Sequence, residues 1–430
     1  EESVDLQPVE PAFAYRFADG AHVRVPGVDP ARAAAAFGAA FGGTAERDWR
    51  ALIDRGSRMW QLTREPFLQS PLRGWRTLLG LARSADAVRT VAPWNTLRDL
   101  GDDLIADPRL RLVLDRYATY SGSDPRRAPA VLATIPYVEQ TFGTWHLGGG
   151  LGTLATALAA RCVDRGVRIR TECDVVRIDV DDGRVRGVTL ADGEHLPAEV
   201  VVANADAGLV YDRLLDAPSA RRPARRPARR PARTLARTTA STSGFTLLLA
   251  VRGRTPGVEH HNVWFPKDYD AEFDSVFGRR PHPVEDPAIY ACVPDDPLMR
   301  PDDEHESWSI LVNAPRHGAG RGTIDWDAPG LADRYVEHVL DVLAARGTDL
   351  RDRLAWREVR TPADLQRTTR APGGAIYGTS SNGARAAFRR PANATPVAGL
   401  YLVGGSTHPG GGLPLVGLGA EIVADLVGRA

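Results

Sequence analysis

The C-terminal segment of the chain most constrains its fold class. It consists of an apolar strand, a glycine-rich turn and an apolar helix. We predict the strand at Leu400–Val403 and the start of the helix near Leu415. Six glycines lie between Gly404 and Gly417, and glycine lets the backbone approach a flat ring or a phosphate closely. The free N–H groups at a helix start favour an anionic or electron-rich ligand. The segment therefore predicts a ligand site on an α/β fold.

A second regular block, over residues 151–203, combines a helix with a meander. The leucines of 151–165 fall on one helical face, and the helix is expected to end at Gly166. A short strand at 167–170 is predicted next, followed by strands that turn at Asp182-Gly183 and Asp192-Gly193. The apolar run at 199–203 predicts a buried strand.

The remainder of the chain mixes strands and helices. Alternating apolar residues around Asp19-Gly20 predict a β-hairpin over 12–26. Helical spacings follow from Asp29 to about Leu114, including a helix through Leu78–Leu81. Apolar strands are expected at residues 244–251, near residues 260–266, and at residues 307–314. The pattern indicates a mixed α/β (α+β) architecture.

Composition and charge exclude several classes of protein. The formal net charge is zero, which argues against a general nucleic-acid binder. No window reaches the roughly 18 apolar residues of a membrane-spanning helix. The three cysteines show no C-x-x-C spacing, which predicts no metal site and favours a reduced, cytoplasmic setting. The adjacent His260 and His261 would point to opposite faces of a strand, so they predict no metal site either.

Arginine use is strongly biased, because Lys267 is the only lysine among 54 basic residues. We therefore give any single arginine little weight as a functional residue. The sequence "RRPA" occurs three times over 221–232, inside an Arg/Pro-rich segment at 216–237. Proline at every fourth residue opposes helix and sheet, so we expect a solvated loop. The alternative is a basic tether for an anionic membrane surface.

A partial dinucleotide fingerprint occurs at Gly150-x-Gly152-x-x-Ala155, with Glu172 about twenty residues further on. The fingerprint requires an apolar strand immediately before it. The preceding residues, "VEQTFGTWHL", are too polar for a central parallel strand. We therefore interpret the match as accidental and do not predict NAD(P) binding.

Two stretches carry a resemblance to a known family: "THPGGGLP" after "LYLVGGS", and "GGGLGTLATALAARCVDRGVRIRTECDVVRI". The chain resembles the phytoene desaturase family of FAD-dependent carotenoid desaturases. The resemblance implies an FAD-dependent, amine-oxidase-like flavoprotein with a discontinuous Rossmann-like FAD domain and a mixed-sheet and helical substrate domain. It also implies a bacterial enzyme of carotenoid biosynthesis that is cytoplasmic and peripheral on the inner face of the cell membrane.

The resemblance carries over to a small set of residues. Val175 and Ile178 match a V-x-x-I element whose backbone meets the adenine. The C-terminal motif beside the flavin ring and ribityl chain is matched by Gly404, Gly405, Ser406, Gly412, Leu413 and Pro414. Ser406 departs from the glycine that many members have. No catalytic residue is identified; His408 is the candidate for a polar group near the ring, or alternatively orients the turn.

The resemblance also divides the chain. Residues 144–210 and 388–430 are expected to belong to the FAD domain, and residues 12–143 and 238–387 to the domain for the polyene substrate. The family opens with a βαβ unit that carries G-x-G-x-x-G, and we find no such unit before residue 12. We therefore expect this chain alone to bind FAD weakly.

The predicted function is the FAD-dependent introduction of double bonds into a hydrophobic carotenoid or isoprenoid polyene. A related carotenoid oxygenase or isomerase is the alternative within the same fold. A redox-silent polyene-binding protein, or a subunit that requires a partner chain, is the alternative from another class. Nucleic acid is not expected as a partner, and the sequence makes no prediction of oligomeric state.

Overall fold

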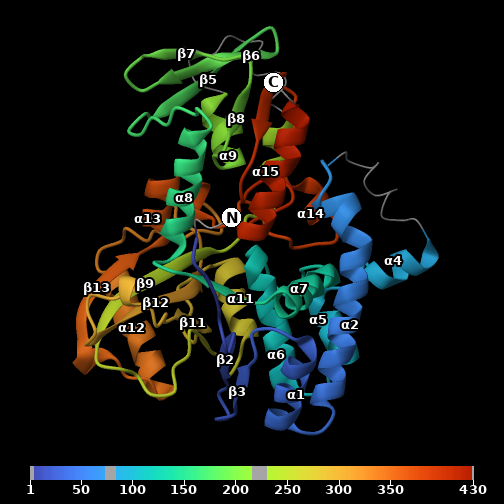
Figure 1. The fold of residues 1–430 in the computed structure, drawn as a ribbon, viewed down its shortest axis with the longest axis vertical. Helices are drawn as coiled ribbons and strands as arrows, with labels where there is room; N and C mark the ends of the chain where they lie inside the picture. The colour runs from blue at the N-terminus through green and yellow to red at the C-terminus, as the bar shows by residue number, and fades with distance from the viewer. Residues whose placement is uncertain (1–3, 73–83, 216–229, 429–430) are drawn as a thin grey trace.

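The computed structural model describes residues 4–72, 84–215 and 230–428 (Figure 1). The predicted helix through Leu78–Leu81 lies outside these residues, as does most of the "RRPA" repeat. Residues 230–235 are helical, although we expected a loop up to residue 237.

A seven-stranded mixed sheet is the largest element of the described structure (Figure 1). Its strands, in spatial order, are β13 (Leu354–Arg360), β9 (Ser243–Arg252), β12 (His305–Ala314), β11 (Ile289–Cys292), β10 (His261–Trp264), β2 (Phe13–Arg16) and β3 (His22–Val25). Neighbours are antiparallel except β10 and β2, which are parallel. The predicted β2–β3 hairpin is confirmed, as are the predicted strands at β9, β10 and β12.

Helices cover both faces of this sheet. Successive residues of a strand point to opposite faces, so a strand that is apolar throughout needs cover on both. Val263 belongs to a hydrophobic cluster with the N-terminal helices, whereas the next residue, Trp264, belongs to a cluster with α12 (Leu331–Ala345). The helices of the first cluster are α1 (Pro30–Phe41), α2 (Ala45–Thr63), α5 (Leu97–Leu104), α6 (Pro108–Arg116) and α7 (Thr134–Phe142), with α11 (Asp270–Phe277) beside them. Figure 1 shows α12 and the N-terminal helices on opposite sides.

A smaller part of the structure lies at the carboxyl ends of α8 (Leu151–Asp164) and α15 (Leu413–Val427) (Figure 1). It contains the antiparallel sheet of β5 (Val175–Asp181), β6 (Arg184–Leu190) and β7 (His195–Pro197), which confirms the predicted meander. It also contains the parallel pair of β8 (Val201–Ala203) and β14 (Leu400–Leu402). A third hydrophobic cluster, which includes Ile178, Leu209 and Leu402, joins these strands.

Two expectations about this smaller part are wrong. Residues 167–170 form no strand, because no other described strand lies beside them, and Val167 and Ile169 are half-exposed. Strand β8 is not fully buried: Val202 is 47% exposed. The apolar face of α8 is also open, with Leu151 64% exposed. Strand β8 and helix α8 are exposed for the same physical reason. The two-stranded parallel sheet of β8 and β14 has too little area to bury the apolar side chains of both elements.

Candidate functional site

The carboxyl ends of β8 and β14 meet beside the glycine-rich turn that follows β14. Leu402 pairs with Ala203, so Asn204 and Gly404 leave the two strands at the same edge. A Cβ atom on Gly404 would lie 2.4 Å from Asn204 Oδ1, so a larger residue would displace the Asn204 side chain, and the φ of 105° also favours glycine. Ser406 Oγ accepts a hydrogen bond from the Ala207 N–H at 3.0 Å. In open α/β sheets this edge is where ligands bind.

The turn from Gly404 to Gly412, called here the glycine loop, packs closely against residues 377–379. A Cβ on Gly411 would lie 2.2 Å from Tyr377 Cδ1. A Cβ on Gly378 would lie 2.6 Å from Ser406 Cβ and 3.3 Å from Asp206 Oδ2. The glycines at these positions therefore permit contacts between segments, as well as exposing backbone.

Arg390 is buried at the centre of this packing. Its guanidinium donates hydrogen bonds to the carbonyl oxygens of Tyr377 (3.0 Å), Gly405 (2.9 Å) and Thr379 (2.8 Å). Burial lowers the pKa of Arg390 to about 10, and the carboxyl of Asp206 opposes this shift. Arg390 therefore stays charged at neutral pH and fixes the glycine loop against residues 377–379.

His408 anchors the glycine loop to the end of the N-terminal helices. Its Nε2 lies 2.9 Å from the carbonyl oxygen of Phe67 and 3.0 Å from that of Ser70, so Nε2 carries the proton. Burial lowers the pKa of His408, which keeps the imidazole neutral. Its Nδ1 is buried without a hydrogen-bond partner among the described residues. These contacts hold the turn to the segment after α2, and a role of His408 near the flavin ring stays a prediction.

The amino end of α15 opens at the loop. Its cap is Gly412, at φ 93°, and no side chain caps the helix. A Cβ on Gly412 would meet nothing within 4 Å, Leu413 is exposed, and Pro414 has no N–H. The first-turn amides of Leu413 and Leu415 therefore have no capping side chain, and they lie with the positive end of the helix dipole beside the open space at Gly412. Such an end suits a flavin or phosphate oxygen, so these residues fit the cofactor that the sequence predicts.

Val175 and Ile178 lie on β5, in the meander and apart from the glycine loop (Figure 1). Ile178 is buried in the third cluster. The meander meets the amino end of β14 through a 2.9 Å hydrogen bond from the Val185 N–H to the Ala398 carbonyl. The glycine loop follows the carboxyl end of β14. The two groups of predicted residues thus lie at opposite ends of one strand.

Sequence reasoning missed Arg390, Tyr377 and Asp206. Burial raises the pKa of the Asp206 carboxyl, which accepts a 2.7 Å hydrogen bond from the Gly208 N–H. Only the position of Asp206, immediately after an apolar strand, signalled a role in the sequence. Arg390 was hidden by the high arginine content of the chain.

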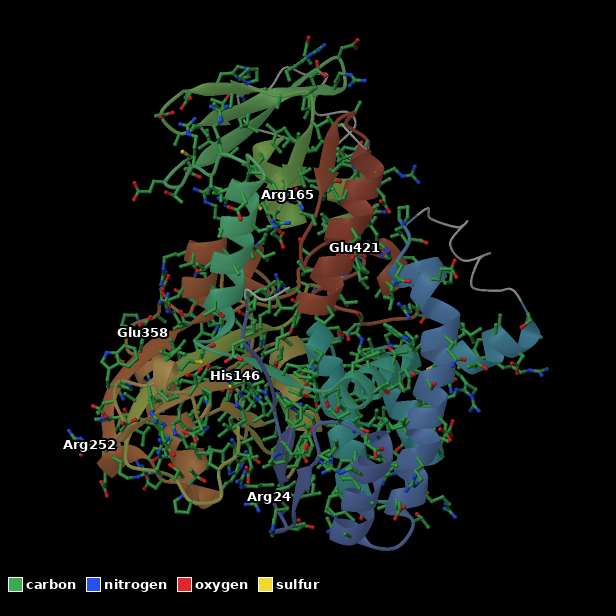
Figure 2. All side chains as sticks on the ribbon, viewed as in Figure 1. Arg24, His146, Arg165, Arg252, Glu358 and Glu421 are labelled. Atoms are coloured by element: carbon green, nitrogen blue, oxygen red, sulfur yellow. The ribbon has the colours of Figure 1, made fainter. Side chains whose placement is uncertain are left out.

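A cluster of titratable residues lies in the seven-stranded sheet, away from the glycine loop. His260 precedes β10, so its ring lies 4.5 Å from that of His261, which corrects our expectation that the two would point to opposite faces. Together with Cys292 they place potential ligand atoms within 4.8 Å of one another. His261 Nδ1 lies 2.8 Å from the Tyr290 hydroxyl. His146, labelled in Figure 2, stacks edge-on against His260.

The context of the partial fingerprint at residues 150–155 is also visible. The strand before it, β4 (Trp145–Leu147), pairs antiparallel with β1 (Leu6–Pro8) in a separate two-stranded sheet. A dinucleotide fingerprint would follow a central parallel strand. The structure therefore supports our decision against NAD(P) binding here.

By length and hydropathy, none of the described helices qualifies as a membrane-spanning segment.

Solved structures share this fold. Cyclohexylamine oxidase from Brevibacterium oxydans matches 99% of this chain and 83% of that protein with a TM-score of 0.55 and 14% identity. The structure of putrescine oxidase bound to putrescine also matches 99% of this chain and 83% of that protein, with a TM-score of 0.58 and 12% identity. The expected amine-oxidase-like flavoprotein fold is therefore confirmed.

The sequence profile of the flavin-containing amine oxidoreductases matches residues 53–424. The chain belongs to this family and is an FAD-dependent oxidoreductase. It is 33% identical over 401 residues to a hydroxyneurosporene desaturase of Cereibacter sphaeroides, covering 91% of this chain and 77% of that protein. It is 29% identical to a 4,4'-diapolycopene oxygenase of Methylomonas, covering 99% of this chain and 82% of that protein.

The pKa of His261 predicts an acid-sensitive fold. Burial, together with the charges of His260, Arg116 and His146, lowers this pKa to about 3, whereas it is about 6.5 in the unfolded chain. Between about pH 6.5 and about pH 3, His261 binds a proton in the unfolded chain but not in the folded one. A fall in pH therefore favours unfolding. At about pH 5 His261 should lower the free energy of unfolding by about 2 kcal/mol relative to neutral pH.

The H261Q variant measures this contribution, because glutamine can bond the Tyr290 hydroxyl and does not titrate. Urea unfolding near pH 7.5 and near pH 5 should show a larger loss of stability on acidification in the wild type than in H261Q. Equal losses in the two proteins would show that His261 titrates normally in the folded state.

Proposed function

We propose that this protein is an FAD-dependent desaturase that introduces double bonds into a carotenoid polyene. The observation that carries the proposal is the 33% identity to a hydroxyneurosporene desaturase across 91% of the chain. A 1-hydroxycarotenoid 3,4-desaturase of Flavobacterium, 31% identical over 77% of this chain and 65% of that protein, supports it. A redox-silent binding protein is the weaker alternative, since the glycine loop keeps the features that suit a flavin.

We place the cofactor along β14. The ring and ribityl chain would lie at Gly404, Gly405, Ser406, Gly412, Leu413 and Pro414, where the uncapped amides of α15 face open space. The adenine would lie near the backbone of Val175 and Ile178, at the other end of β14. Residues 144–210 and 388–430 would then form the FAD part, and residues 12–143 and 238–387 the substrate part.

The reaction requires little acid–base chemistry from the protein. FAD, when bound, would accept a hydride from an allylic carbon of the substrate while the adjacent carbon loses a proton, so that the substrate loses two hydrogens and FAD is reduced to FADH2. Arg390 keeps the glycine loop in shape by its three carbonyl contacts. His408 stays neutral and holds the loop to the carbonyls of Phe67 and Ser70. The residues around the loop therefore act by orientation and by exclusion of water.

An oxygenase is the second candidate, favoured by the match to 4,4'-diapolycopene oxygenase over nearly the whole chain. Product analysis separates the two reactions. Holoprotein with carotenoid-loaded liposomes should give products that have lost pairs of hydrogens and absorb at longer wavelength, detected by chromatography and mass spectrometry. Products that have gained oxygen would replace the desaturase by the oxygenase.

Substitution of Gly412 tests the cofactor placement. In G412V a branched side chain would occupy the open space at the start of α15, so we expect most of the flavin to be lost. Positive φ adds a strain of about 1–3 kcal/mol. The measurement is the ratio of bound flavin to protein at equilibrium with excess FAD, relative to the wild type, together with the melting temperature.

G347V is the matched control. Gly347 follows α12 at φ 87°, and a Cβ there also meets nothing within 4 Å. The backbone strain is thus similar, but Gly347 lies outside the segments along which we place FAD. Full flavin content in G412V, or equal loss in both variants, would contradict the placement.

We also propose that the enzyme is cytoplasmic and peripheral on the inner face of the cell membrane. Exposed apolar side chains gather around the β1–β4 pair: Leu6, Val28, Phe142, Trp145 and Leu298. We call these five the β1–β4 patch. A Cβ on Gly143 would touch both Val28 and Trp145, and one on Gly149 would lie 3.7 Å from Leu298. A lipid surface is an apolar partner that such a patch suits.

Liposome flotation tests this patch. We expect W145S and L298S each to bind liposomes several-fold more weakly than the wild type, since each removes exposed apolar area. W94S is the control, because Trp94 is similarly exposed but lies outside the patch. If W94S weakens binding as much as W145S, or neither variant weakens it, the patch is not the membrane contact.

A further inference from the structure

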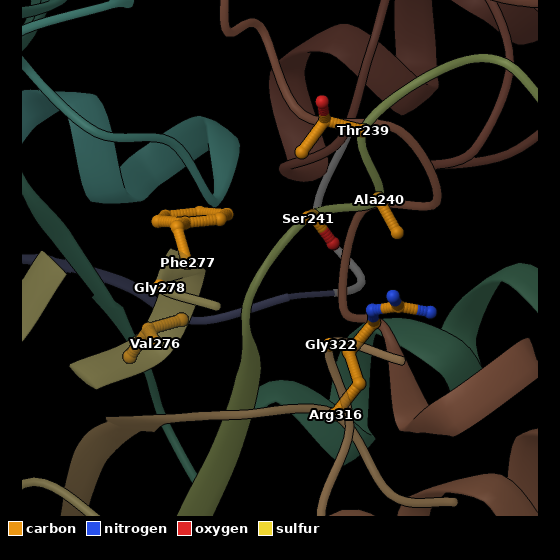
Figure 3. Close-up of a pocket in the computed structure, with 8 residues that line it drawn as sticks. All are labelled: Thr239, Ala240, Ser241, Val276, Phe277, Gly278, Arg316 and Gly322. Carbon is orange, nitrogen blue, oxygen red and sulfur yellow. The ribbon is translucent and has the colours of Figure 1, made fainter. Parts of the chain in front are cut away.

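A pocket lies between three segments of the substrate part, away from the β8–β14 edge. Its walls are the end of α11, residues 239–241 before β9, and the loop after β12 (Figure 3). Val276 and Phe277 give it an apolar side. Thr239, Ser241 and Arg316 supply its polar groups. The lining therefore combines one cation with an apolar wall.

Arg316 has no hydrogen-bond or ion-pair partner for its guanidinium within residues 4–72, 84–215 and 230–428. The other partly buried arginines among the described residues are paired. Arg98 lies 2.9 Å from Asp115 and 2.6 Å from Asp270, and Arg346 bonds Asp286 and two carbonyls. Arg390 bonds three carbonyls. Arg316 is therefore unpaired within the described residues, and its guanidinium is open to an external partner.

Arg316 is half-buried, and burial alone lowers its pKa. A cation that loses water without gaining a partner destabilises the fold. A ligand with an anionic oxygen would supply the partner, since a guanidinium matches a carboxylate in shape and charge. The apolar wall of Val276 and Phe277 then suits the chain attached to that carboxylate.

The pocket is connected to the glycine loop by direct contacts. Ser241 Oγ accepts a hydrogen bond from the Tyr377 N–H at 3.0 Å, and the Ser241 N–H donates to the Gly378 carbonyl at 2.9 Å. Tyr377 in turn packs against Gly411 of the loop. Ser241 on the pocket wall is therefore linked to the glycine loop through Tyr377.

We propose that this pocket binds a carboxylate at the end of an apolar chain, and that in this enzyme the occupant is the oxidised end of a polyene. The assignment rests on the proposed function for the polyene, whereas the carboxylate site rests on Arg316 alone. A free fatty acid offers the same chemistry from a different source. Arg316 is then a specificity-determining residue for substrates with an acidic end group.

The test is a binding measurement on the full chain, which requires no turnover. Retinoic acid is the polyene carboxylate probe, retinol is the matched probe without the carboxylate, and palmitate is the saturated carboxylate. Tryptophan fluorescence quenching gives the affinities of both retinoids, and palmitate is tested by competition. We expect R316Q to weaken retinoic acid binding about tenfold or more and to leave retinol binding unchanged.

R321Q is the control, because Arg321 lies exposed on the same loop. It should bind retinoic acid like the wild type. Equal affinity for retinoic acid in the wild type and R316Q, or equal weakening in R321Q, would overturn the carboxylate site. Palmitate that competes as strongly as retinoic acid would overturn the polyene assignment.

Stability supplies a second readout. Since R316Q removes an unpaired charge, its melting temperature should equal or exceed that of the wild type. A fall of several degrees would show that Arg316 is structural and would overturn the proposal. Failure of the desaturase itself would appear in the product analysis and would leave these binding results unchanged.

Discussion

The buried guanidinium of Arg390 is the interaction on which the glycine loop depends. It bonds three carbonyl oxygens from two segments, residues 377–379 and Gly405, which no strand pairing joins. Glycine-rich backbone has high conformational entropy, so a loop of this composition needs an external contact to hold one shape. Arg390 provides that contact with charge-assisted hydrogen bonds, which are stronger than neutral ones. The open amides at the start of α15 follow from the shape that it maintains.

Two further polar side chains, His408 and Asp206, lie near this charge. The His408 imidazole is held neutral by burial and bonds two carbonyls of the segment after α2. The Asp206 carboxyl, whose pKa burial raises, accepts a hydrogen bond from the Gly208 N–H in the segment after β8. His408 connects the glycine loop to the segment after α2, and Ser406 connects it to Ala207. The site is therefore positioned by side chains around the loop, while the loop itself offers backbone to a ligand.

Much of the backbone could be predicted from local patterns. The alternation around Asp19-Gly20 correctly predicted the β2–β3 hairpin, and the turns at residues 182–183 and 192–193 correctly predicted the β5–β7 meander. The helix α8 ends near the glycine that was expected to end it. These elements were predictable because their hydrogen bonds join residues that are close in the sequence. The site was predictable only at its glycine loop, where strand, glycines and helix are consecutive.

Sequence alone determined the strand–loop–helix unit at residues 400–427 and the flavoprotein resemblance, since both reside in contiguous residues. Tertiary structure decided which polar residues matter. Arg390 and Arg316 are two arginines in a chain in which Lys267 is the only lysine, so no local signal distinguishes them. Folding buries the first among carbonyls and leaves the second without a partner in a pocket. That difference depends on segments distant in sequence, because the environment of a charge is set by what packs around it.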